Sequence, residues 1–283
     1  GGELYYASRT YVSWCWKAGG SSNTYNIDGK GYATATAAGL DGGTKNPTGA
    51  SVNTKAGFSI ISYVASNGTN DTIYHGLKQA PEMIFTKDRD NSRGWGVYYS
   101  LPGGTNTNWA RLDVSNAQGT NDSGDTLGGV SGSYMYLHED YFQPSHAAYA
   151  NGGDDGSDNL IAYMWHSVPG YSKMGIYKGN ANANGVYVPL GFRPAWVMVK
   201  KTNGANSWVI YDAKRSPENV IDNYLIAEGT DVDNTNAASN IDFLHDGFKF
   251  RSGYDMVNAG DYIYMAFAEQ VNDTPYVAPT NAR

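Results

Sequence analysis

Apolar and polar positions follow the same pattern in two separate parts of the chain. Residues 193–212 contain a proline, an apolar run, a lysine, a polar turn, and then a tryptophan and a tyrosine three residues apart. Subtracting 113 from the positions of these four residues gives the same types, without a gap, at Pro81, Lys87, Trp95 and Tyr98. The run at 196–199 is apolar throughout, which indicates a strand covered on both faces. Asn203-Gly204 suits a tight turn, so we predict a β-hairpin written twice, at 80–99 and 193–212.

Other strand-like stretches occur in the same order around both hairpins. They lie at residues 58–64, 72–77, 134–142 and 160–165 in the first part, and at 174–178, 186–190, 243–251 and 262–267 in the second. Adding 107 to His138 gives His245, which places these two histidines at equivalent positions. Roughly six to eight strands per part suit a β-sandwich, with a two-sheet jelly roll as the alternative topology. We therefore predict an all-β fold of two tandem related β-sandwich (jelly-roll-like) modules, with short or no helices; one short helix is expected to begin at Ser216.

The predicted domain organisation follows from this repeat. Residues 1–55 are interpreted as an N-terminal strand and a Gly-, Ala-, Thr- and Asn-rich linker, 56–170 as β module 1, 171–270 as β module 2, and 271–283 as a C-terminal tail. Residues 11–16 resemble the closing strands of both modules. They are interpreted either as the last strand of a missing preceding module or as a strand lent to the first module. The start at Gly1 is interpreted as a trimmed or processed end.

Composition and charge narrow the class of protein. The chain has 35 Gly, 23 Tyr and 7 Trp with 17% charged residues, which is typical of a turn-rich, aromatic-rich β protein. Its net charge of −7 argues against nucleic acid as a partner and against attachment to anionic lipid. Cys15 is the single cysteine, so no internal disulfide or thiolate metal site is expected. No apolar run approaches the length of a membrane span, so membrane insertion is not expected.

The sequence offers no catalytic constellation. A glycosidase needs two opposed carboxylates, but the acidic residues here cluster in Asn- and Gly-rich loops, which are usually solvated turns. Carboxylates in such a loop also suit calcium, and the candidate ligands are Asp154, Asp155 and Asp158, although their spacing fits no EF-hand. His138 and His245, each followed by an acidic residue, form either a duplicated ligand site or structural hydrogen bonds.

The aromatic residues divide into two groups. Trp95, Trp208, Tyr98 and Tyr211 recur at equivalent positions, which favours a role in the core, although exposed aromatics on a β-sandwich also stack on sugar rings. Loop tyrosines are better candidates for contact with a partner, and those selected as ligand-binding residues are Tyr141, Tyr149 and Tyr171.

Several longer motifs carry a family resemblance. YVSWCWKAGG, AGFSIISYVASNG, HGL followed by APEMI, GFRPAWVMVKK, SWVIYD, IDFLHDGFKFRS, YIYMAFAE and the terminal NAR resemble a duplicated module in virion-associated proteins of marine tailed bacteriophages. In such proteins the module often follows a laminin-G-like jelly roll. The resemblance implies a virion structural protein of tail-fibre, tail-appendage or head-decoration type, and it brings no catalytic residues. The loop at 143–158 departs from the pattern because it is longer.

We therefore expect a non-enzymatic protein on the virion surface that acts in assembly, host-surface attachment or both. Other virion proteins are the expected partners, together with copies of the chain itself, a trimer first, and host surface glycans. No cofactor is expected, apart from the candidate calcium. Two alternatives remain open: a carbohydrate-binding, lectin-like module of an extracellular protein, and a glycan-degrading enzyme.

Overall fold

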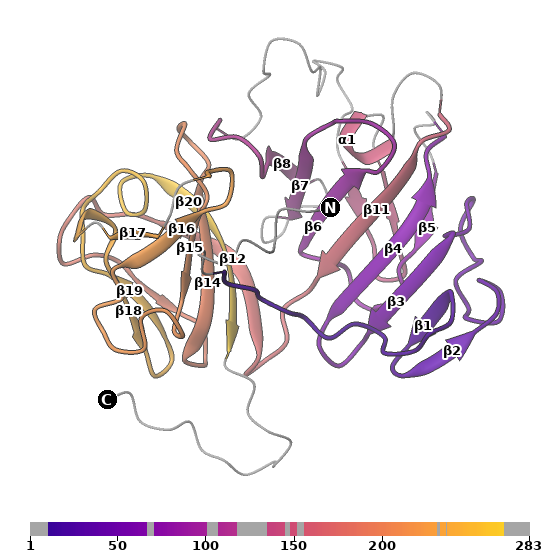
Figure 1. The fold of residues 1–283 in the computed structure, drawn as a ribbon, viewed down its shortest axis with the longest axis horizontal. Coiled ribbons are helices and arrows are strands. Elements are labelled where there is room, and N and C mark those ends of the chain that lie inside the picture. The colour runs from indigo at the N-terminus through magenta and orange to yellow at the C-terminus, as the bar shows by residue number, and fades with distance from the viewer. Residues whose placement is uncertain are drawn as a thin grey trace.

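The fold is all-β, as the alternating and continuous apolar runs predict. The structure is a computed structural model that describes residues 11–66, 71–100, 107–117, 135–144, 148–151, 156–230, 233–235 and 237–268. Figure 1 shows two groups of strands side by side, the first coloured indigo to pink and the second salmon to yellow. Each group has one large and one small sheet, so each forms a two-layered sandwich.

Module 1 contains the strands up to residue 165 and one short helix. Its elements are β1 (Tyr25–Ile27), β2 (Lys30–Tyr32), β3 (Gly49–Asn53), β4 (Phe58–Val64), β5 (Ile73–Tyr74), β6 (Met83–Asp88), β7 (Trp95–Ser100), β8 (Thr107–Arg111), β9 (Tyr136–Leu137), β10 (Tyr141–Gln143), α1 (Ala148–Asn151) and β11 (Asn159–Trp165). The large sheet has the order β2-β1-β3-β4-β11-β6-β7-β8, and the small sheet has the order β5-β10-β9. The pairing is antiparallel except between β1 and β3.

Module 2 repeats this plan in a shorter stretch of chain. Its elements are β12 (Ser172–Lys178), β13 (Tyr187–Pro189), β14 (Pro194–Lys201), β15 (Val209–Asp212), β16 (Asn223–Ile226), β17 (Asn234–Thr235), the 3-10 turn η1 (Ala237–Ser239), β18 (Ile241–Leu244), β19 (Gly247–Phe250) and β20 (Asp261–Ala268). The large sheet has the order β12-β20-β14-β15-β16-β17, and the small sheet has the order β13-β19-β18.

The strand orders confirm the duplicated hairpin. The series β4-β11-β6-β7-β8 in module 1 corresponds to β12-β20-β14-β15-β16 in module 2, and in both the last strand of the module is inserted beside the hairpin. The strand register of the two hairpins agrees as well. Met83 pairs with Tyr99 in the first hairpin, and the residues 113 positions later, Trp196 and Asp212, pair with each other in the second. The hairpin is therefore the same structural element in both modules.

Each module has its own core between its two sheets. In module 1 the core includes Tyr63, Tyr98 and Phe142, and in module 2 it includes Tyr211 and Phe248, all of which are buried. A hydroxyl inside such a core needs a partner. Tyr211 meets this need by donating a 2.6 Å hydrogen bond to the Ser239 carbonyl.

Three expectations about local structure are wrong. Residues 18–55 are not a linker, because β1, β2 and β3 extend the large sheet. The sequence did not reveal these strands because the inward residues of β3, Ala50 and Val52, are small and give a weak apolar pattern. Residues 11–16 form no strand, and the expected helix at Ser216 is replaced by bends. In addition, the edge strand β8 lies in a region where no strand was predicted. The predicted tail, 271–283, lies outside the described residues.

Candidate functional site

The two large sheets pack against each other through a third apolar cluster, which we call the intermodule seam. Alternate residues of one strand serve different clusters: Val197 and Val199 of β14 lie in the module 2 core, whereas Trp196 and Met198 lie in the seam. The continuous apolar run at 196–199 predicted this double coverage. The buried seam residues contributed by both modules include Phe58, Met83, Tyr99, Trp165, Met174, Trp196, Met198, Trp208, Ile210, Ile263, Met265 and Phe267.

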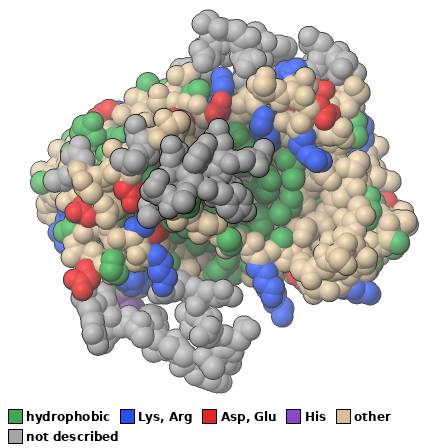
Figure 2. Space-filling view, viewed as in Figure 1, with side chains coloured by type: hydrophobic (Ala, Val, Ile, Leu, Met, Phe, Trp, Pro, Cys, Tyr) green, Lys and Arg blue, Asp and Glu red, His purple; other side chains and the backbone are tan. Residues whose placement is uncertain are grey.

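A cavity of about 400 Å³ lies in the seam. Aromatic and aliphatic side chains of both large sheets form its walls, among them Phe58, Phe85, Tyr163, Trp165 and Met198. In Figure 2, hydrophobic side chains gather in the hollow where the two modules meet. Trp16, from the N-terminal segment, completes the lining and packs edge-on against Trp196 and Phe267, with ring centroids 5.5 and 5.3 Å apart.

Two side chains of the second hairpin donate hydrogen bonds to the other module across the seam. The Trp208 indole donates a 2.7 Å hydrogen bond to the Arg111 carbonyl of β8. The Lys200 ammonium donates to the carbonyls of Ser115 and Asn116 at 3.1 and 2.7 Å, and within its own hairpin to that of Asn206 at 2.7 Å. Burial of Lys200, with a smaller effect of neighbouring Lys201, lowers its pKa to about 8, although Glu228 opposes the shift.

Among the described residues, the first hairpin keeps the local half of this arrangement and lacks the contact with the other module. Lys87 donates a hydrogen bond to the carbonyl of Arg93, just as Lys200 does to that of Asn206. Arg93 and Asn206 are equivalent positions, since they are 113 residues apart, so both copies share this contact within the turn. Lys87 is half-buried, whereas Lys200 is fully buried. The contact with the other module is thus specific to the second copy.

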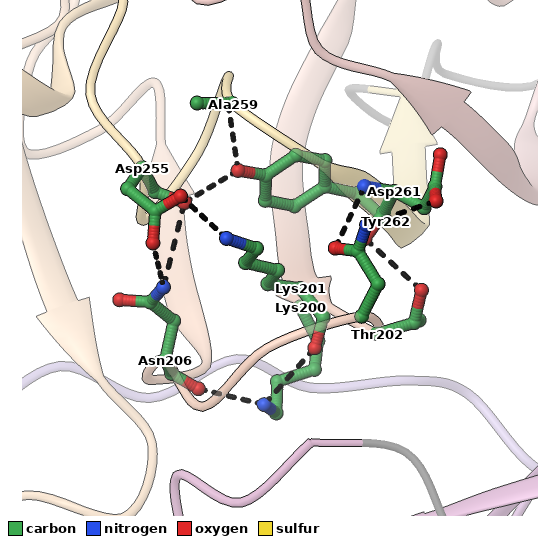
Figure 3. Close-up of polar contacts among 9 residues, drawn as sticks. Lys200, Lys201, Thr202, Asn206, Asp255, Ala259, Asp261 and Tyr262 are labelled. Atoms are coloured by element: carbon green, nitrogen blue, oxygen red, sulfur yellow. Dashed lines mark hydrogen bonds and ion pairs between the residues drawn. The ribbon is translucent and has the colours of Figure 1, made fainter.

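The turn after β14 is held by a polar network, drawn in Figure 3. Lys201 forms an ion pair with Asp255, and Asn206 donates a 2.7 Å hydrogen bond to the same carboxylate. Thr202 donates to the backbone carbonyl of Asp261, which begins β20, at 3.0 Å. These side chains join the turn to the chain that leads into the central strand, so we assign them to the scaffold.

A second surface of interest is the outward face of the small sheet of module 1, which we call the aromatic face. It carries Tyr74, Tyr136, His138 and Tyr141, while Ile73 and Phe142 of the same strands point into the core. The rings of His138 and Tyr141 stack with centroids 4.2 Å apart, and Tyr74 lies 6.0 Å from Tyr141 at an interplanar angle of 27°. His138 and Tyr136 are exposed, the latter by 37%.

The buried His75 supports this face from below. Its Nδ1 accepts a 3.1 Å hydrogen bond from the Leu77 backbone N–H, which leaves Nε2–H to donate to the His138 carbonyl at 3.0 Å. Burial lowers the pKa of His75 to about 4, so the ring is neutral at pH 7. A neutral His75 therefore fixes the backbone of the β9–β10 hairpin at the point where the exposed ring stack begins.

The three predicted ligand-binding tyrosines lie in different surroundings. Tyr141 belongs to the aromatic face. Tyr171 packs edge-on against Phe267 of the seam at 5.9 Å, where burial raises its pKa. Tyr149 belongs to α1, and its side chain lies outside the described part of the chain. Of the three, Tyr141 is therefore the candidate for ligand binding, and its neighbour Tyr74 is a residue that the sequence did not single out.

The calcium prediction stays a prediction. Asp154 and Asp155 lie outside the described residues, and Asp158 is buried, with its backbone carbonyl accepting from the Ala65 N–H at 2.8 Å. Among the residues that the structure describes, no three His, Cys, Asp or Glu side chains gather as a metal site.

The proposed equivalence of His138 and His245 is wrong. Phe142 pairs with Leu137 and Phe248 with Phe243, so the two small sheets correspond with an offset of 248 − 142 = 106 instead of 107. His138 then corresponds to Leu244. A shift of one residue moves a side chain to the opposite face of a strand, so the two histidines do not form a duplicated site.

Comparison with known proteins gives a family and no function. None of the helices in the described ranges has the length and apolar character of a membrane span. No curated protein and no solved structure matches the chain. A family model matches residues 2–271, and the chain therefore belongs to the family described as "Domain of unknown function (DUF7483)".

Proposed function

We propose that this chain is a non-enzymatic structural protein of a tailed bacteriophage particle, located on the virion surface as a tail fibre, tail appendage or capsid decoration. Its role is assembly with other virion proteins, host-surface attachment, or both. The resemblance of the long sequence motifs to virion-associated proteins supports the biological setting. The structure supports the mechanical part of the proposal through the way in which the two modules are joined.

The intermodule seam is the observation that carries this proposal. Side chains of both large sheets bury each other in one apolar cluster, and Trp208 and Lys200 add hydrogen bonds from one module to the backbone of the other. Apolar burial of this kind, reinforced by these hydrogen bonds, resists rotation of one sandwich against the other. A two-module unit that keeps its shape suits a rigid building block of a particle.

Self-association is part of the proposal, with a trimer as the first expectation. β12 is an edge strand of the large sheet of module 2, and Ile176 on this strand is 49% exposed. An edge strand offers unpaired backbone groups to another chain, and an exposed isoleucine adds apolar area. Light scattering coupled to size exclusion measures the oligomer, and substitution Ile176→Lys tests whether this edge takes part.

The location is tested on purified particles. Phage are banded by density, their proteins are identified by mass spectrometry, and intact particles are labelled with gold-conjugated antibody against this chain. We expect the chain in the particle fraction and gold on the outer surface. Presence of the chain in infected cells together with its absence from purified particles contradicts the proposal.

A further inference from the structure

The small sheets of the two modules differ in one systematic way. Their inward positions match: Ile73, Leu137 and Phe142 correspond to Val188, Phe243 and Phe248, and all belong to a core or pack against one. Their outward positions do not match, because the four aromatic residues of module 1 correspond to non-aromatic residues of module 2. In the order Tyr74, Tyr136, His138 and Tyr141, the counterparts are Pro189, Asp242, Leu244 and Gly247.

Module 2 shows that this sheet folds without any of these four rings, because its outer face carries a single tyrosine, Tyr187, at a different position. The rings of Tyr136, His138 and Tyr141 are therefore an addition to a surface that does not need them for folding, whereas Tyr74 also packs against the module 1 core. They are also arranged: Tyr141 lies between His138 and Tyr74, and its ring is inclined by 23° and 27° to theirs. Two neighbours fix members of the set. His75 holds the backbone at His138, and Gly42 approaches Tyr74 so closely that a Cβ at this position would lie 2.6 Å from the tyrosine ring.

The polar groups around the rings indicate which ligand they suit. Glu139 and Asp140, at the tip of the hairpin between His138 and Tyr141, are exposed carboxylates that accept hydrogen bonds from hydroxyl groups. The same two charges repel an acidic ligand. Aromatic rings offer apolar faces to the C–H face of a sugar, and hydroxyl-bearing edges beside them bind its polar groups. A neutral pyranose combines both properties.

We propose that the aromatic face, formed by Tyr74, Tyr136, His138 and Tyr141, is a binding site for neutral pyranose sugars. The sugar ring packs on the two exposed rings, His138 and Tyr136, while Tyr141 is stacked against His138 and holds it in place. The hydroxyls of the sugar donate to the carboxylates of Glu139 and Asp140. Module 2 has no counterpart of this site, so one chain binds one sugar at this surface. The inference deepens the attachment role proposed above and depends on it for its biological meaning, since it names the class of host-surface ligand.

The test is a titration of the full chain with methyl glycosides of glucose, galactose, mannose and N-acetylglucosamine, followed by saturation-transfer NMR. Two variants replace an aromatic residue: Tyr141→Ala, at a position where module 2 has glycine, and His138→Leu, which installs the residue of module 2. The control is Tyr187→Ala, which removes a 39% exposed tyrosine from the small sheet of module 2. Thermal unfolding of each variant checks that the fold is kept.

We expect at least one glycoside to bind, with affinity reduced about fivefold or more in Tyr141→Ala and His138→Leu and unchanged in Tyr187→Ala. Absence of binding by all four glycosides overturns the proposal. Binding that only the control variant weakens also overturns it. The location on the particle is measured separately, so failure of sugar binding leaves that proposal standing, and absence from particles leaves the sugar site standing.

Discussion

The indole Nε1–H of Trp208 in module 2 donates a 2.7 Å hydrogen bond to the backbone carbonyl of Arg111 in module 1. Arg111 is the last residue of β8, which is the edge strand of its sheet in the part of the chain that the structure describes. The indole thus bonds to a carbonyl of an open sheet edge, and it does so while its ring is 1% exposed in the seam. One side chain contributes both to the apolar contact between the modules and to their relative position.

Trp208→Phe is expected to lower the free energy of unfolding by about 1 to 3 kcal/mol, because it keeps an aromatic ring but leaves a buried carbonyl without its donor. The matched control is Trp95→Phe at the equivalent position of the first hairpin. Trp95 is half-buried, and its expected change is within about 0.5 kcal/mol. Urea unfolding of both variants gives the comparison. Equal losses in the two variants contradict the role of the Arg111 contact.

Lys200 gives a prediction about pH. Burial lowers its pKa to about 8 in the folded state, compared with an ordinary value of 10.5, so between these limits the unfolded chain binds more protons. Stability contributed by this residue therefore rises with pH from about 8 upwards. The carbonyl acceptors favour the charged form, which limits the gain to roughly 1 to 2 kcal/mol at pH 9.5 relative to pH 7.5.

The comparison uses Lys200→Met and, as a matched control, Lys87→Met in the first hairpin. Urea unfolding at pH 7.5 and 9.5 should show a smaller rise, or a larger fall, for Lys200→Met than for the wild type, whereas Lys87→Met should follow the wild type. Tyrosines that begin to ionise in the unfolded chain near pH 9.5 lower the stability of all three proteins alike, so their effect cancels in the comparison. Identical pH dependence of the wild type and Lys200→Met contradicts the lowered pKa.

The repeat and most of the strands could be predicted from the sequence, because a buried strand leaves a direct signal in residue type. The apolar run at 58–64 forms β4. The run at 196–199 is covered on both faces, as predicted, by the module 2 core on one side and the intermodule seam on the other. The short strands β1, β2 and β8 carry few large apolar residues, so periodicity alone did not reveal them.

The candidate site was harder to predict because it depends on the register between distant strands. Tyr141 was selected from its loop-like surroundings, but its neighbour Tyr74 lies 67 positions earlier and becomes adjacent only through the β5–β10 pairing, with 141 − 74 = 67. The false equivalence of His138 and His245 has the same origin, since alignment by residue type placed two histidines together where the pairing places a leucine. The cavity likewise depends on how the two sheets meet.

His75 is expected to make the protein less stable in acid. Its pKa is about 4 in the folded state because of burial and 6.5 when unfolded, so the unfolded chain binds more protons between these values. Stability contributed by the neutral ring is thus complete above pH 6.5 and falls as the pH decreases towards 4, by about 2 to 3 kcal/mol at pH 4.5. Nearby Asp140 favours the charged ring and His166 disfavours it, and both are smaller effects.

Chemical denaturation at pH 7 and pH 4.5 tests this effect against two substitutions. His75→Gln removes the titrating group and should lose less stability on acidification than the wild type, although it starts from a lower value at pH 7. His245→Gln, at an exposed turn of module 2, should behave as the wild type does. The idea fails when all three proteins lose the same free energy between the two pH values.

Trp16 anchors the N-terminal segment in the seam, although residues 11–16 form no strand. Its ring lies 6.4, 5.5 and 5.3 Å from those of Trp165, Trp196 and Phe267, so it touches both modules. Trp16→Ala should lower the free energy of unfolding by about 2 kcal/mol, which is less than for a fully buried tryptophan because the ring is partly exposed. The substitution should also increase the fluorescence of a dye that binds apolar surfaces. Tyr11→Ala removes a 51% exposed ring from the same segment and should change neither measurement. Equal behaviour of the two variants contradicts an anchoring role, because it means that the seam closes without the indole.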